Sequence, residues 1–334
     1  MQIIVNNMSF PDNDHLWLGQ TEPADYVEEK HCLACNTLMI PYAMIQNKHG
    51  EVGLETSLCP KCGHTQRTRN LSPEYFSTHF TSKWLKRRDE EIVETDYVYS
   101  KTKEHLPPAA KILDLGCGLG GSLLAFKNRG YQVYGVEPSE HRANIGKSLM
   151  PSIEVGTAEE YLKNTEEKFD LIYLFDVIQF VKDPYSLIRL ANKRLSKNGK
   201  IWFKLGVYHH RSNFSQFVHF SMLRNYLNLY SLKDFLNDEN LYPIQYQKEP
   251  IELLLSKQKH KDTDSIIESA EQLELPTIES FAKKTLHLNR LRLFGRTKLS
   301  YLNRKTNISL VRPLTQILPV SFVHQTSKIP VLFK

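Results

Sequence analysis

The sequence has no long hydrophobic run, and none of its apolar stretches approaches the roughly 18 residues that a membrane-spanning helix needs. Its opening residues, MQIIVNNMSFPDND, lack the basic segment and the extended apolar segment of a secretory signal. Internal repeats and low-complexity segments are missing as well. We therefore expect no transmembrane segment and a cytoplasmic globular protein. Its 334 residues suffice for one large domain with appendages or for two domains.

Cysteine is scarce, and the odd total of five argues against the disulfide framework of a small secreted protein. Four of the five form two C-x-x-C pairs, Cys32 with Cys35 and Cys59 with Cys62. Four thiolates in two close pairs make a closed tetrahedral site for Zn²⁺, and Gly63 after the second pair allows a tight turn. The pattern predicts a structural zinc ribbon within residues 1–72, where the metal would contribute to folding.

Acidic residues are absent from residues 281–334, which contain 11 Lys and Arg. The other 280 residues carry 32 Lys and Arg against 37 Asp and Glu, so a mildly acidic body precedes a basic tail. Such a tail suggests contact with phosphate, either on an anionic membrane, which would place the protein peripherally there, or in RNA. The alternative is that the tail docks on the acidic body. We assign the acidic linker and the tail to residues 258–334.

Between residues 111 and 257, short apolar runs alternate with helical patterns, which predicts a parallel β-sheet covered by helices on both faces. The predicted strands are 111–115, 131–137, 152–158, 169–176, 200–206, 242–248 and 251–257. The last two are expected to form a hairpin that ends the sheet near Lys257.

Local signals also predict helix boundaries. Apolar residues recur at intervals of seven between positions 85 and 99, which predicts an amphipathic helix within residues 73–105. The segment DPYSLIRLANKRL predicts a helix that closes at Gly199. Ser231 is expected to cap the helix that follows the fifth strand.

The strand at 111–115 runs into GCGLGG, where four glycines fall within six positions. Glycines let a backbone approach a ligand closely, and the next helix begins with free N–H groups. Gly116, Gly118 and Gly121 fit the G-x-G-x-x-G pattern of dinucleotide-binding proteins, so the glycines alone do not decide the ligand. Asp114, directly before them, would repel a pyrophosphate but suits a cation. Glu137, at the end of the next strand, suits the two hydroxyls of a ribose.

A longer part of the sequence resembles the class I S-adenosylmethionine-dependent methyltransferases. It comprises ILDLGCGLGGSLLAFKNRGYQVYGVEPS, GTAEEYL, FDLIYLFDVIQFVKDP and LSKNGKIWFKLG, and the resemblance covers residues 110–255. The resemblance implies a Rossmann-like seven-stranded α/β methyltransferase sheet, in a domain that we place at residues 73–257. It also implies that Asp114 orients the methionine amine, that Glu137 binds the ribose diol and that Asp176 lies near the sulfonium.

Further cofactor contacts are implied by the same resemblance. Ala158 and Glu159 would lie near the adenine, and Cys117 is expected to fill space in the loop. The complete implied cofactor-binding set is Asp114, Gly116, Cys117, Gly118, Glu137, Pro138, Ala158, Glu159 and Asp176.

A zinc ribbon ahead of such a domain resembles the architecture of deoxysugar C-methyltransferases and their relatives. The segments SPEYFSTHF and LNLYSLKDFLNDENL resemble parts of the same enzymes. Their Tyr-His-Glu-His run is replaced here by Leu-Arg-Asn-Tyr at 223–226, and their Glu-His by Gln179 and Phe180. Since C-methylation needs a base, the resemblance implies a carbohydrate-related acceptor without fixing the atom that is methylated.

Residues 207–230 form an insertion rich in aromatic residues, His and Asn. Open α/β sheets bind ligands beyond the carboxyl ends of their strands, so the insertion is expected to cover the acceptor site. A hydroxyl acceptor benefits from a general base that titrates near pH 7, which favours histidine. The candidate catalytic residues are His209, His210, His219 and Tyr226.

Three functions remain open at this point. The first is a methyltransferase that acts on a carbohydrate or a related small metabolite. The second is a tRNA or rRNA methyltransferase that grips RNA with the ribbon and the tail, although the body is acidic and no Asn-Pro-Pro-Tyr-like signature follows the fourth strand. The third is a non-enzymatic module that binds the cofactor but has lost its acceptor site.

Overall fold

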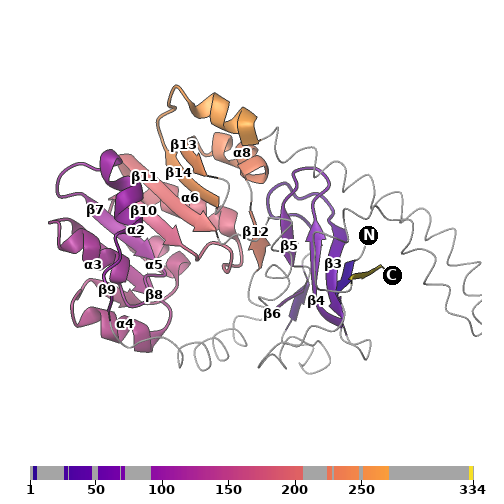
Figure 1. The fold of residues 1–334 in the computed structure, drawn as a ribbon, viewed down its shortest axis with the longest axis horizontal. Helices are drawn as coiled ribbons and strands as arrows, with labels where there is room; N and C mark the ends of the chain where they lie inside the picture. Colours follow the sequence, from indigo (N-terminus) through magenta and orange to yellow (C-terminus); the bar gives the residue numbers. More distant parts are fainter. Residues whose placement is uncertain are drawn as a thin grey trace, which may run out of the picture. The chain divides into compact units, whose positions relative to one another are not determined.

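The protein folds as two compact units in the computed structural model (Figure 1). One unit comprises Met1–Tyr75, Tyr208–Ser231 and Glu271–Lys334, and the other comprises Phe76–Val207 and Leu232–Ala270. The structure describes residues 3–5, 26–28, 30–46, 52–67, 69–71, 92–205, 224–227, 229–247, 251–270 and 331–333. No helix among these residues has the length and apolar character to cross a membrane.

The second unit is built on a seven-stranded sheet in the order β13-β14-β11-β10-β7-β8-β9. Its strands are β7 (Lys111–Leu115), β8 (Gln132–Glu137), β9 (Ile153–Val155), β10 (Phe169–Phe175), β11 (Leu195–Leu205), β13 (Tyr242–Gln247) and β14 (Ile251–Ser256). The strands from β7 to β11 run parallel, whereas β14 is antiparallel to both β11 and β13. The structure confirms the predicted mostly parallel α/β sheet with its terminal hairpin.

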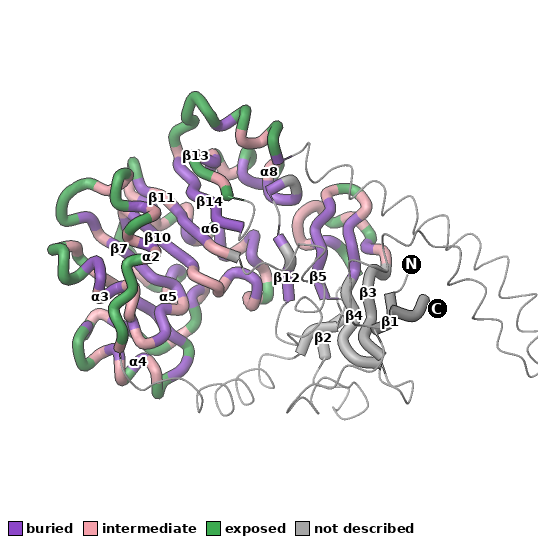
Figure 2. The backbone as a smooth tube through the Cα atoms, in the orientation of Figure 1, coloured by how far each residue is buried: buried purple, intermediate pink, exposed green. Residues whose placement is uncertain are grey.

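Helices cover this sheet. They are α2 (Tyr97–Thr102), the 3₁₀ turn η5 (Lys103–His105), α3 (Gly121–Lys127), α4 (Glu140–Lys147), α5 (Ala158–Asn164), α6 (Pro184–Arg194) and α8 (Leu229–Asp238). Adjacent strand residues point to opposite faces, and Ile112 and Leu113 are both fully buried, so the sheet is covered on both sides (Figure 2). Residues Val98, Leu123 and Phe126 of α2 and α3 share one hydrophobic cluster with Ile112.

Hydrogen-bonded caps fix where three of the helices begin. Ser139 caps α4, Asp183 caps α6, and Thr157 forms a capping box with Glu160 at α5. These caps place the starts of α4 and α5 directly after β8 and β9, whereas residues 176–183 separate β10 from α6. The loops after β8 and β9 at the carboxyl edge of the sheet are therefore short.

Three predicted boundaries are wrong. Residues 92–96 are not helical, so the pattern at intervals of seven does not form one helix, and α2 begins only at Tyr97. Helix α6 ends at Arg194, and Gly199 lies inside β11, where a Cβ would come within 2.6 Å of the carbonyl oxygen of Phe169. That glycine therefore permits a close strand contact and does not end a helix. Ser231 lies within α8 and does not cap it.

The first unit is made of β-strands. One sheet has the order β12-β5-β4-β3-β1-β15, and β2 pairs with β6. The strands are β1 (Ile3–Val5), β2 (Tyr26–Glu28), β3 (Ile40–Gln46), β4 (Val52–Leu58), β5 (Thr65–Arg67), β6 (Arg69–Leu71), β12 (Asn225–Tyr226) and β15 (Val331–Phe333). The turns next to β3 and β5 carry the two cysteine pairs.

Candidate functional site

The glycine loop after β7 lies where the sheet order reverses. From β7 the chain passes to β8 and β9 on one side, and β10 and β11 lie on the other. Such a reversal opens a ligand crevice at the carboxyl edge of a parallel sheet. Gly116 and Gly118 have φ of +85° and +59°, and a Cβ on Gly116 would lie 2.5 Å from Val177 Cγ2. Both the backbone conformation and the lack of space therefore require glycine here.

Asp114 is a buried carboxyl group at this edge. Its side chain is 3% exposed, and its Oδ1 has no hydrogen-bond partner. Burial raises its pKa to about 8; the nearby Tyr173 hydroxyl opposes this and the Glu137 carboxylate adds to it. Tyr173 lies opposite Asp114 on β10, but its hydroxyl is also without a hydrogen bond of normal geometry. A buried acceptor without a donor is costly, so the site suits a cationic or hydrogen-donating ligand.

Glu137 ends β8 and fixes the loop. Its Oε2 accepts the Gly118 N–H at 2.9 Å, and its Oε1 accepts the Ser139 N–H at 3.1 Å. The side chain is 5% exposed. Each carboxylate oxygen can accept a second hydrogen bond, so Glu137 can hold the loop and still receive the hydroxyls of a ligand.

The other predicted cofactor residues lie around the same edge. Asp176 directly follows β10 with φ of +57°, and Ala158 begins α5. Glu159 is half-buried, whereas Pro138 is exposed. The Cys117 side chain is buried in the hydrophobic cluster, where a Cβ on Gly135 would lie 2.8 Å from its Sγ. Burial raises the pKa of the Cys117 thiol, so its side chain fills space beneath the loop.

Of the four predicted catalytic residues, the structure describes only the backbone of Tyr226. His209, His210 and His219 lie outside the described residues. The backbone of Tyr226 belongs to β12 and pairs with Thr65 of β5, in the first unit, and its side chain is outside the described part.

The far part of the carboxyl edge carries a group of aromatic and charged residues that sequence reasoning missed. Phe175, Lys204 and Glu252 lie opposite one another on β10, β11 and β14. The ring of Tyr97 packs 5.6 Å from that of Phe175 and 6.3 Å from that of Trp202, and its hydroxyl donates to Glu252. Burial and the Glu252 carboxylate raise the pKa of Tyr97 to about 12, so the hydroxyl stays protonated. These residues are far apart in the sequence and share no spacing motif.

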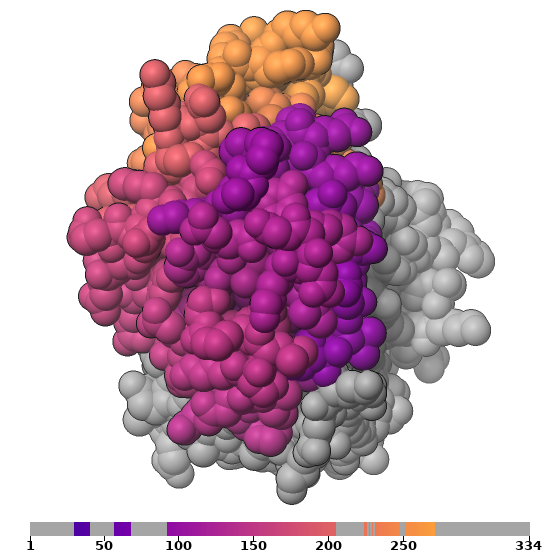
Figure 3. Space-filling model, turned by 90° about the vertical axis from the view of Figure 1, so that its left-hand side faces the viewer, coloured from indigo at the N-terminus to yellow at the C-terminus, as the bar shows by residue number. Residues whose placement is uncertain are grey.

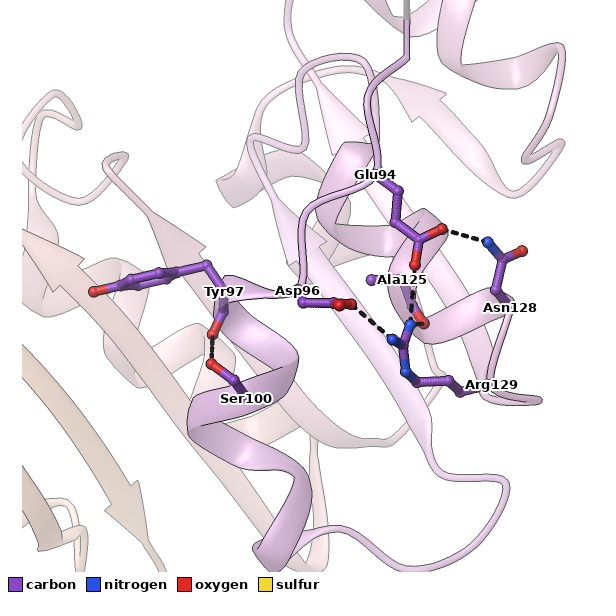
Figure 4. Close-up of polar contacts among 7 residues, drawn as sticks. All are labelled: Glu94, Asp96, Tyr97, Ser100, Ala125, Asn128 and Arg129. Carbon is purple, nitrogen blue, oxygen red and sulfur yellow. Dashed lines mark hydrogen bonds and ion pairs between the residues drawn. The ribbon is translucent and has the colours of Figure 1, made fainter.

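Arg129, just after α3, holds the segment that leads into α2. Its guanidinium lies 3.0 Å from Glu94 Oε1 and 2.9 Å from Asp96 Oδ1, and Asn128 donates to the other oxygen of Glu94 (Figure 4). The Tyr97 side chain points away from these ion pairs, toward the strands (Figure 4). The segment therefore orients Tyr97 over the sheet edge.

The same segment touches the first turn of α3. The Thr95 N–H donates to the carbonyl oxygen of Gly121 at 3.1 Å. A Cβ on Gly121 would lie 2.3 Å from the carbonyl oxygen of Val93. In the space-filling view the purple residues from 92 onward share one face with the magenta residues that follow them in the sequence (Figure 3).

The four paired cysteines of the first unit form a compact cluster. Their ligand atoms all lie within 4.8 Å of one another, with Sγ–Sγ distances of 3.6 Å for Cys32–Cys62 and 3.5 Å for Cys35–Cys59, and none forms a disulfide. Four sulfurs about 2.3 Å from a tetrahedral ion would be about 3.8 Å apart. Residue Asn36 after the first pair has φ of +56°, as the glycine after the second pair has φ of +72°. The cluster could hold a metal ion.

Comparison with known proteins supports the same domain. Residues 83–245 match a family model described as a methyltransferase domain. The ubiquinone biosynthesis O-methyltransferase of Stutzerimonas stutzeri is 30% identical over 107 residues, which are 30% of this chain and 46% of that protein. The enzyme of the same name from Aliivibrio fischeri is 27% identical over 101 residues, 28% of this chain and 42% of that protein. The chain thus spans less than half the length of these curated relatives.

Two solved structures are similar in part. The magnesium protoporphyrin IX methyltransferase of Synechocystis, solved with bound S-adenosylhomocysteine, is 13% identical with a TM-score of 0.42, covering 55% of this chain and 95% of that one. A SAM-dependent methyltransferase from Archaeoglobus fulgidus is 14% identical with a TM-score of 0.39, covering 48% and 92%. The strand order of the sheet is that of the Rossmann-like methyltransferase fold, and the family model matches the residues that form most of this sheet.

Proposed function

We propose that the protein transfers a methyl group from S-adenosylmethionine to a small-molecule acceptor, and that the acceptor is a carbohydrate or a related metabolite. The observation that supports the donor assignment is the buried Asp114 carboxyl group beside the glycine loop, whose Oδ1 has no hydrogen-bond partner. A cationic amine would supply the hydrogen bond and the opposite charge that such a carboxyl group needs in order to be ionised while buried.

The residues around the loop suit the rest of the donor. Glu137 has acceptor capacity left for the ribose hydroxyls, and the glycines at 116 and 118 let the backbone approach the ligand closely. Ala158 and Glu159 would lie beside the adenine, and Asp176 would lie near the sulfonium. When bound, the donor supplies an activated methyl group, and the protein's task is to hold the acceptor in line with it.

The acceptor assignment rests on architecture. A cysteine cluster ahead of a methyltransferase domain supports a carbohydrate-related acceptor by its resemblance to sugar methyltransferases. The ubiquinone O-methyltransferases match this chain over only 101–107 residues, so we do not assign the acceptor of those enzymes to this protein. We also propose that Cys32, Cys35, Cys59 and Cys62 hold a structural Zn²⁺, because four protein sulfurs leave no open position for catalysis.

The test is calorimetry and a product assay on the full-length, zinc-loaded protein. We expect S-adenosylmethionine and S-adenosylhomocysteine to bind, and S-adenosylhomocysteine to be released when a screen of sugars and sugar nucleotides contains the acceptor. If neither ligand binds, the donor assignment is wrong. Release with tRNA or rRNA in place of small molecules would favour the RNA alternative, and binding without turnover on any acceptor would favour a non-enzymatic module.

A further inference from the structure

Lys204 lies at the carboxyl edge of the sheet, beside the proposed donor site. It is the penultimate residue of β11, and its carbonyl oxygen accepts the Asp176 N–H at 3.1 Å. Its ammonium lies 4.7 Å from the ring centre of Tyr97 and 4.6 Å from that of Phe175. The side chain is half-buried. Lys204 therefore presents a positive charge at the edge where open α/β sheets bind ligands.

The carboxylate opposite Lys204 on the neighbouring strand β14 already has hydrogen-bond and ion-pair partners. Glu252 lies opposite Lys204 in the register of β11 and β14, and it is 5% exposed. Its Oε1 accepts the Tyr97 hydroxyl, and its Oε2 lies 3.2 Å from Lys101 Nζ. Both oxygens of this carboxylate therefore have partners other than Lys204.

No carboxylate in the described part of the chain forms an ion pair with Lys204. In contrast, Lys101, Lys111 and Lys259 each lie within 3.2 Å of an acidic oxygen. In the described part of the chain, the contacts of the Lys204 ammonium are two aromatic faces, which attract a cation without carrying a full negative charge. A half-buried ammonium in this setting attracts an anion more strongly than one in water.

Tyr97 and Phe175 limit how such an anion can approach. The Tyr97 hydroxyl is fixed by Glu252, and its helix is held in place by the Arg129 ion pairs (Figure 4). Two sides of the Lys204 ammonium are thus occupied by aromatic rings, which restricts the directions from which an anionic group can approach it.

We propose that Lys204 binds a carboxylate or phosphate group of the acceptor, so that the acceptor is an acidic small molecule and not a neutral one. The proposal rests on the proposed function, whose acceptor class it narrows. Lys204 acts here in binding and specificity, and no proton transfer is assigned to it.

The experiment measures dissociation constants by calorimetry on the full-length, zinc-loaded protein saturated with S-adenosylhomocysteine. The probes are three matched pairs: glucose 6-phosphate and glucose, galacturonate and galactose, and benzoate and benzyl alcohol. The variants are Lys204→Met and, as a control on the same strand, Lys200→Met, whose Nζ donates to the carbonyl oxygen of Asn198 near the other end of β11. S-adenosylhomocysteine is titrated into each variant first.

We expect the wild type and K200M to bind the anionic member of at least one pair tenfold or more tightly than the neutral member. K204M should lose that preference while it keeps its affinity for S-adenosylhomocysteine. The proposal is overturned if the wild type shows no preference in any pair, or if K204M retains it. Failure of the wild type to bind S-adenosylhomocysteine would instead overturn the proposed function, so the two failures are distinguishable.

Discussion

Replacing Asp114 with asparagine should abolish the proton release that accompanies S-adenosylmethionine binding. Asp114 is 3% exposed and its pKa is about 8, so only about 3% of the free protein carries the ionised carboxylate at pH 6.5. The amine of the ligand, with a pKa near 7.7–8.0 in ordinary α-amino groups, is then almost fully charged. An ammonium beside Asp114 favours the carboxylate, so binding should expel about one proton.

The measurement is calorimetry at pH 6.5 in two buffers that differ in ionisation enthalpy, since the difference in apparent binding enthalpy counts the protons released. Asp114→Asn keeps the size of the side chain and cannot titrate. Asp262→Asn, at a side chain 57% exposed, is the matched control and should behave as the wild type. Equal proton release by the wild type and D114N would refute the role given to this carboxyl group.

The same substitution should change how stability depends on pH. The folded pKa of Asp114 is raised from 3.8 to about 8, so its contribution to stability is greatest below pH 4 and is lost as pH rises toward 8. At about 1.4 kcal/mol per pH unit, the wild type should lose roughly 5 kcal/mol across this range relative to D114N. Urea unfolding of the ligand-free protein at several pH values measures this difference.

Three further substitutions test other parts of the structure. Gly121→Ala should lower the free energy of unfolding by about 1–3 kcal/mol, because the added Cβ would clash with the carbonyl oxygen of Val93. In the control Gly156→Ala the added Cβ would lie at an ordinary contact distance, so the loss should be smaller. Equal losses of the two variants in urea unfolding would contradict the contact. Cys59→Ser should lose about one equivalent of zinc by atomic absorption, and retained zinc would show that the cluster is not the metal site. Thr157→Ala should cost about 1 kcal/mol in the same urea assay through its capping box, and no change would show that the cap contributes nothing.

The donor side of the domain was predictable because its signals are local. The strand at Lys111–Leu115 was predicted without error, since an apolar run ends at a glycine turn. Asp114 and Glu137 were selected as cofactor-binding candidates because Asp114 precedes that turn and Glu137 ends the next strand. The structure brings both to one edge, with Gly118 donating to Glu137.

The residues around Lys204, where we propose that the acceptor binds, could not be predicted in the same way. Tyr97, Lys204 and Glu252 come from a helix and two antiparallel strands, so only strand register and helix packing bring them together. The prediction that Gly199 ends a helix was wrong, because the sequence does not distinguish a glycine that ends a helix from one that permits a close contact between strands. The pattern at intervals of seven failed because hydrogen bonding to Gly121 keeps Thr95 out of the helix.

The contact between Gly121 and Val93 joins the glycine loop to the segment that carries Tyr97, whose ring forms one wall of the proposed acceptor site, the acceptor wall. The first turn of α3 continues the glycine loop, and the carbonyl oxygen of Val93 occupies the place of a Gly121 side chain. A few residues further on, the same segment carries Tyr97 to the other side of the edge. Ordering of the loop by a donor would thus be transmitted through backbone contacts to the acceptor wall, and we expect a sequence of events in which the donor enters first and the acceptor second.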